Sequence, residues 1–151
     1  MQPILFIVFL PLLAALVAGL GNRAIGNGPA KLVTTGALFV AHAALKIFVF
    51  TPAGTAGYFA SIGLPGFLAY VTIALALFGG LALIAGFYTR WVSLVLVPVL
   101  LGAAWFGHGA AGFFFSNPNG GWEYPAFWAI VMVVQALLGD GAHALAKRSA
   151  A

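Results

Sequence analysis

Long apolar runs dominate the chain and predict helices that span a membrane. Five runs can be drawn, and they cover approximately residues 4–20, 32–50, 67–88, 91–106 and 125–138. A helix of about 20 apolar residues crosses a bilayer core roughly 30 Å thick, so each run is long enough, or nearly long enough, to be a span. The period-two alternation of transmembrane β-strands does not occur in them. The pattern therefore predicts an all-α fold, a polytopic transmembrane helical bundle.

The composition of the chain supports this prediction. Hydrophobic residues make up 64% of the 151 residues and charged residues only 5%, against roughly 25% charged residues in an average soluble domain. Lipid is therefore expected to cover most of the surface. The net charge of +4 comes from scattered basic residues, which form no stripe that could neutralise several phosphates, so a nucleic-acid partner is excluded.

The chemistry open to the chain is narrow. Because it contains no cysteine, it can form no disulfide, no cysteine-ligated cluster and no covalent haem attachment. Its predicted spans contain no carboxylate and no metal-ligand spacing, so no metal site is predicted. Any redox role would need a cofactor that is not bound covalently, or a partner.

The basic residues predict how the chain is oriented. They lie in the first loop, the third loop and the carboxyl-terminal tail, and are absent from the second and fourth loops: Arg23, Lys31, Arg90, Lys147 and Arg148. Cytoplasmic loops carry the excess of basic residues in membrane proteins. The carboxyl terminus is therefore expected in the cytoplasm and the amino terminus on the opposite, outer side. The first run lacks the basic flank of a secretory signal and is interpreted as a retained span.

Polar residues within and beside the second run are the first candidates for a functional site. His42 and Lys46 are four residues apart, so they share one face of a helix inside an otherwise apolar run. The alternatives are an interfacial anchor for Lys46 and a neutral imidazole, hydrogen-bonded between helices, for His42. A bis-histidine haem is disfavoured because His42 and His108 are expected at different depths.

The outer ends of the fourth and fifth runs supply the other candidates. His108 ends the fourth run, and Trp122, Glu123 and Tyr124 precede the fifth. The two aromatic residues alone are typical of a membrane-interface belt. Glu123 is the only outward acid, so a pairing with Lys46 is expected because it would lower the cost of burying either charge. The candidate quinone or polar pocket consists of His42, Lys46, His108, Trp122, Glu123 and Tyr124.

Small residues in the third run predict close helix packing. Gly79, Gly80 and Gly86 occur with alanines at small-xxx-small spacing, which lets membrane helices approach closely.

Several of these features together resemble the DoxX family of small bacterial membrane proteins. The resemblance covers about residues 37–145. It rests on four groups of residues: Ala41-His42 with Lys46-Ile47-Phe48, residues 54–61 with Gly63-Leu64-Pro65, Gly79-Gly80 with residues 86–90 at the end of the third run, and Asn119-Gly120-Gly121-Trp122-Glu123-Tyr124-Pro125. It implies a four-helix core formed by the second to fifth spans, preceded here by one N-terminal span. It also implies an association with quinone-linked oxidoreductases, including thiosulfate:quinone oxidoreductase.

Two departures from the family weaken a catalytic role. The chain has Leu45 where family members often have a glutamine, and Ala76 where they often have an acid. The resemblance therefore favours an accessory subunit of a membrane-bound redox or respiratory assembly. The alternative is a quinone-reactive subunit of a thiosulfate:quinone-type oxidoreductase, so the chain is at most a subunit of a quinone-linked enzyme, with quinone as its one candidate cofactor.

The start of the chain has a different resemblance. Residues 1–40 are similar to the N-terminus of the antiporter-like large subunit of bacterial respiratory complex I, through residues 9–14, 19–23 and 34–36. The expected organisation is an N-terminal span and cytoplasmic loop over 1–31, a DoxX-like membrane domain over 32–145 and a cytoplasmic tail over 146–151. The expected location is the bacterial inner membrane, with larger membrane proteins or further copies of the chain as partners.

The first testable prediction concerns orientation. Cysteines placed at Ser61 and Asn119 should react with an impermeant thiol reagent in intact cells, because no basic residue occurs in either loop. Protection of both positions, together with labelling of a cysteine placed at Ser149, would reverse the orientation.

Overall fold

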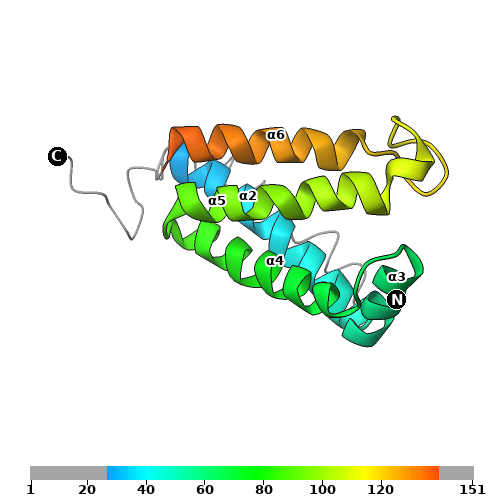
Figure 1. The fold of residues 1–151 in the computed structure, drawn as a ribbon. Coiled ribbons are helices and arrows are strands. Elements are labelled where there is room, and N and C mark those ends of the chain that lie inside the picture. The colour runs from blue at the N-terminus through cyan, green and yellow to red at the C-terminus, as the bar shows by residue number, and fades with distance from the viewer. Residues whose placement is uncertain (1–26, 140–151) are drawn as a thin grey trace. The chain divides into compact units, whose positions relative to one another are not determined.

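The computed structural model describes residues 27–139, and in this range the chain is helical (Figure 1). The elements are α2 (Asn27–Ala44), η1 (Leu45–Val49), α3 (Pro52–Ser61), α4 (Phe67–Ala85), α5 (Thr89–Gly102), η2 (Ala103–Gly107), η3 (Gly109–Ala111) and α6 (Glu123–Leu138). The all-α prediction is confirmed. The first predicted run lies outside the described residues. So do three of the basic residues used to predict the orientation: Arg23, Lys147 and Arg148.

The described helices include membrane spans. Phe67–Ala85 and Thr89–Gly107 are each 19 residues long and apolar enough to cross a membrane, and Val33–Val49 with Pro52–Ser61 forms a third candidate that is bent by 97°. α6 is apolar but shorter, at 16 residues. The chain is therefore a multi-pass membrane protein.

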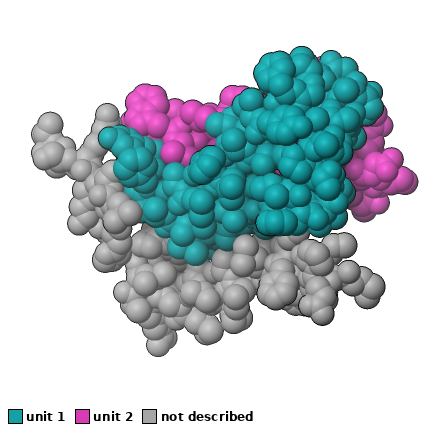
Figure 2. Space-filling view, turned by 90° about the horizontal axis from the view of Figure 1, so that it is seen from below, with its two compact units in different colours: residues 1–89, 140–151 teal, residues 90–139 magenta. Residues whose placement is uncertain are grey.

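The chain divides into two compact units (Figure 2). Unit 1 comprises residues 1–89 and 140–151, and unit 2 comprises residues 90–139. Within the described residues, α2, η1, α3 and α4 belong to unit 1, and unit 2 contains nearly all of α5 together with η2, η3 and α6.

Unit 1 is organised by a close crossing of α2 and α4. A Cβ atom added at Gly80 would lie 2.7 Å from the carbonyl oxygen of Gly36 and 2.9 Å from Cγ2 of Val40. A Cβ at Gly36 would in turn lie 2.5 Å from the carbonyl oxygen of Gly80. The two backbones approach so closely because neither glycine has a side chain. Gly79 is only partly buried, beside the fully packed Gly80.

Gly86 ends α4, and its role in helix packing stays a prediction. It adopts a left-handed conformation (φ 66°, ψ 34°), which glycine reaches without steric cost. The N–H of Phe87 donates to Ala82 O at 2.8 Å and the N–H of Gly86 donates to Leu83 O at 3.1 Å, the pattern of a Schellman cap. The turn between α4 and α5 lies at residues 86–88, and residues 89–91 begin α5.

The segment between the second and third predicted spans contains a helix that the sequence patterning did not predict. Residues 52–61 form α3, at 97° to the preceding helix. Oγ1 of Thr51 accepts the N–H of Gly54 at 3.1 Å, and Pro52 follows at the first helical position, where a missing N–H costs nothing. Thr51 takes a positive φ of 60°, which is strained for a β-branched residue and marks the bend.

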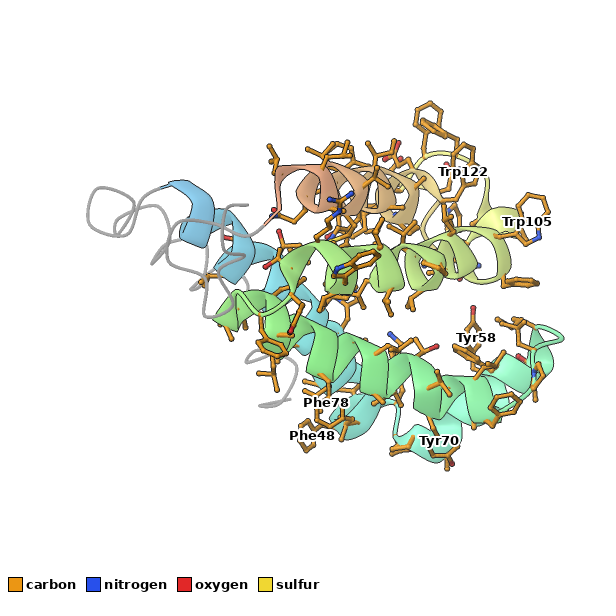
Figure 3. The ribbon with its side chains drawn as sticks, turned by 60° about the vertical axis from the view of Figure 1, so that its left-hand side comes forward. Phe48, Tyr58, Tyr70, Phe78, Trp105 and Trp122 are labelled. Atoms are coloured by element: carbon orange, nitrogen blue, oxygen red, sulfur yellow. The ribbon has the colours of Figure 1, made fainter. Side chains whose placement is uncertain are left out.

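Unit 2 pairs α5 with α6, which lie side by side in Figures 1 and 3. Leu96 of α5 and Met132 of α6 are fully buried, and Trp128 and Ala129 of α6 are nearly so. Pro98 lies inside α5 and removes one backbone donor. α5 continues into η2, a five-residue π-helix, before the chain enters the long loop that leads to α6.

The helix crossing in unit 1 generates the second prediction. Gly80→Ala should destabilise the protein by about 1–3 kcal/mol, the usual cost of overpacking a tight contact. The effect is measured by thermal unfolding in detergent, with the loss of monodisperse protein as the signal.

Gly102→Ala is the matched control, because no described atom lies within 4 Å of a Cβ at that helical glycine. It should leave stability unchanged or raise it slightly. Equal unfolding temperatures for the two variants would contradict the close crossing.

Candidate functional site

A π-helix occurs beside each of the two candidate histidines. η1 (Leu45–Val49) carries Lys46 and follows α2, the helix of His42, and η2 (Ala103–Gly107) ends just before His108. Both π-turns close with an i→i−5 bond, Phe50 N–H to Leu45 O at 3.0 Å and His108 N–H to Ala103 O at 3.1 Å. Such π-turns inside helices are frequent at functional sites.

His42 is tied to its own helix. Its Nδ1 lies 2.9 Å from Leu38 O, four residues earlier. Because a carbonyl oxygen only accepts, Nδ1 carries the hydrogen, and in the neutral ring Nε2 is then an acceptor. The Nδ1 hydrogen of half-buried His42 is thus used within its own helix.

Lys46 stands one turn after His42 and is half-buried. Neither aspartate nor glutamate occurs between residues 27 and 89, so the described part of unit 1 has no carboxylate that could neutralise the ammonium. A lone charge in an apolar segment is costly unless it reaches water, a headgroup or a counter-ion. Its counter-charge must come from outside residues 27–89.

His108 belongs to the loop that joins η2 to α6. Its Nδ1 lies 2.9 Å from Gly120 O and 3.3 Å from Asn119 O. The ring therefore donates from Nδ1 across twelve residues of chain and closes the loop. As in His42, the neutral ring leaves Nε2 as an acceptor.

Glu123 binds the same loop from its other end. Its Oε1 accepts the N–H of Phe115 at 3.0 Å. As the first residue of α6 it also lies where the helix macrodipole favours a negative charge. The carboxylate thus has a structural role within unit 2.

The aromatic candidates pack on phenylalanines of the loop. Trp122 meets Phe113 edge to face, with ring centroids 4.8 Å apart. Tyr124 lies between Phe115, at 5.6 Å, and Trp128, at 6.0 Å. Geometries of this kind add about 0.5–1.5 kcal/mol per pair beyond area burial.

The candidate residues therefore fall into two groups. His42 and Lys46 share one helical segment of unit 1, while His108, Trp122, Glu123 and Tyr124 come together around one loop of unit 2. A single pocket formed by all six, and the pairing of Lys46 with Glu123, stay predictions. Among residues 27–139 there is no group of three or more histidine, cysteine or acidic side chains that could hold a metal ion.

Sequence reasoning missed two residues that shape the loop. Nδ2 of Asn117 donates to Ala111 O at 2.9 Å. Gly121 lies against the carbonyl oxygens of Phe113 and Phe114, which leave no room for a Cβ. The run Asn117-Pro118-Asn119-Gly120-Gly121 signals a turn, but the partners within the turn depend on its three-dimensional course.

Comparison with known proteins identifies the family. The DoxX family model matches residues 33–109, a little more than half of the chain. The chain belongs to the DoxX family. The predicted resemblance is thereby confirmed over this range, which includes His42, Lys46 and His108. The resemblance of residues 1–40 to a complex I subunit stays a prediction.

A curated relative matches part of the chain. CatD of Bacillus subtilis (strain 168), which carries the name "Putative oxidoreductase CatD", is 41% identical over 71 residues. The match covers 47% of this chain and 52% of CatD, so the chain matches only about half the length of this relative. No solved structure matches the chain.

The loop geometry generates the third prediction. Glu123→Ala should loosen the loop by about 1 kcal/mol, because the N–H of Phe115 loses its acceptor. Hydrogen exchange of the peptide covering residues 113–122 should then speed up by roughly fivefold.

Glu123→Gln is the control, since its amide oxygen can still accept this bond. It should exchange close to the parent rate. If the charge rather than the acceptor mattered, as in a tight pairing with Lys46, Gln would be as harmful as Ala.

Proposed function

We propose that this DoxX-family membrane protein is an accessory, non-catalytic subunit of a membrane-bound redox or respiratory assembly in the bacterial inner membrane. The proposal rests on the hydrogen bonds that the polar candidate residues of unit 2 make. His108 and Glu123, the groups most able to handle a proton, bind the backbone of their own loop. Residues that hold a scaffold together in this way favour a structural role.

Exposed apolar surface supports the same proposal. Phe48 of η1 and Phe78 of α4 are 70% and 67% exposed and project outward in Figure 3. Aromatic residues are enriched where membrane proteins meet lipid or other subunits. Larger membrane proteins, or further copies of the chain, would pack on such faces.

The redox part of the proposal rests on the relatives. Family membership and the name of CatD link similar proteins to oxidoreductases. The similarity of residues 1–40 to a complex I subunit favours a respiratory assembly. The proposed orientation places the amino terminus in the periplasm and the carboxyl terminus in the cytoplasm.

The alternative function is a quinone-reactive subunit of a thiosulfate:quinone-type oxidoreductase. One observation bears on it: both His42 and His108 donate from Nδ1 to a carbonyl oxygen. A neutral imidazole of this tautomer offers Nε2 only as an acceptor. In this form the ring cannot donate to a quinone oxygen, which quinone reduction requires, so the observation favours the accessory role.

The fourth prediction separates the two functions. After purification with native lipids, the accessory role predicts no extractable quinone and less than about a tenfold change in turnover with an artificial quinol for His42→Ala or His108→Ala. A catalytic histidine would instead lose about 100-fold or more, the usual contribution of general acid–base catalysis.

The same preparation tests the assembly. The accessory role predicts co-purifying large subunits whose absorption spectrum shows haem, flavin or iron–sulfur centres. Bound quinone with a large loss of turnover in either variant would establish the alternative. A preparation of this chain alone, without redox-active subunits or quinone, would contradict both.

A further inference from the structure

Polar side chains in and beside the loop between η2 and α6 bond to its backbone, while its phenylalanine rings are exposed. We call residues 108–122 the aromatic loop; it extends beyond the ends of α5 and α6 in Figure 1. Three consecutive phenylalanines, Phe113, Phe114 and Phe115, are 47%, 61% and 57% exposed. Single exposed apolar residues are ordinary in proteins, but a run of three large rings is a surface that needs a partner.

The loop is folded rather than loose. The N–H groups of Trp122 and Glu123 donate to Gly112 O and Phe113 O, both at 3.0 Å, so the two arms of the loop are paired. Asn117 and Gly120 donate to acceptors within the tip, at 3.0 and 2.8 Å. The side chains of His108, Asn117 and Glu123 also bond to the loop backbone.

This inward bonding fits surroundings that are poor in water. Irregular backbone is tolerated at membrane depth only when its polar groups find partners inside the protein. The aromatic loop thus meets a requirement of the membrane interface.

The length of α6 indicates where the loop lies. Its 16 residues give a helix about 24 Å long, whereas the hydrocarbon core is roughly 30 Å thick. Flanking residues must make up the difference. The carboxyl-terminal flank is Gly139 and the charged Asp140, while the amino-terminal flank is the aromatic loop. A charge stands at each end, Glu123 as the first residue of α6 and Asp140 beyond Gly139, so each flank makes up part of the difference, and on the loop side that part is apolar.

We propose that the aromatic loop is a preformed membrane anchor, with Phe114 and Phe115 inserted into the lipid interface at that end of α5 and α6. The partner that we propose for these rings is lipid. Trp105 of η2, 78% exposed, also projects outward in Figure 3. The polar tip at Asn119 remains in water.

Single cysteines test the anchor, because the chain has none of its own. Phe114→Cys, Phe115→Cys and the control Asn119→Cys are reconstituted in phosphatidylcholine vesicles with a water-soluble maleimide on both sides of the membrane. The thiols at 114 and 115 should react about tenfold more slowly than the thiol at 119, since apolar surroundings disfavour the reactive thiolate. All three should react alike after denaturation in dodecyl sulfate.

A nitroxide on each cysteine gives a second measurement. At positions 114 and 115 it should collide more with oxygen, which concentrates in lipid, than with a water-soluble nickel chelate, and at position 119 the order should reverse. Unchanged tryptophan emission shows that each variant keeps its fold. Because the reagent is present on both sides, the result does not depend on the orientation of the chain or on its redox role.

Three outcomes would overturn the proposal. Equal reactivity of the three thiols in vesicles would place the loop in water. Protection that rises with the protein-to-lipid ratio would mean that a second copy covers the rings. Protection found in native membranes but not in vesicles would mean that another protein covers them.

Discussion

Satisfying backbone hydrogen bonds where water is scarce is the constraint on which the rest of this structure depends. Helices meet it internally, so the difficult places are where helices end. Gly86 closes α4 with a Schellman cap, and Thr51 caps α3 with its hydroxyl. In unit 2 the same task falls to His108 and Glu123, which serve the loop backbone. In residues 27–139, Thr51, His108 and Glu123 thus serve backbone groups at or just beyond the ends of helices.

The spans were predictable from sequence because hydropathy alone specifies them. α4 and the α5–η2 helix lie within three residues of the predicted runs at each end. α3 was missed because residues 51–61 contain proline and two glycines, which resemble a turn. The Thr51-Pro52 pair is an N-cap followed by a proline at the first helical position, which is a signal for the start of a helix. In the structure this signal prevails over the glycines.

The candidate site was predictable only where spacing determines geometry. Four residues between His42 and Lys46 place them on one side of a helix, whatever the rest of the fold does. The bond from His108 to Gly120 spans twelve residues of irregular chain. No periodicity describes such a loop, so its partners follow from the positive φ angles of Gly112, Asn119 and Gly120 and from the lack of a side chain at Gly121.

The distribution of charge and aromatic rings favours function through surfaces. In residues 27–139 the only acid, Glu123, binds backbone. A catalytic centre normally keeps its proton-handling groups poised toward a substrate rather than committed to scaffold bonds. Lys46 is the exception, since residues 27–89 offer it no carboxylate. Its ammonium group therefore has to reach water, a headgroup or a charge outside residues 27–89.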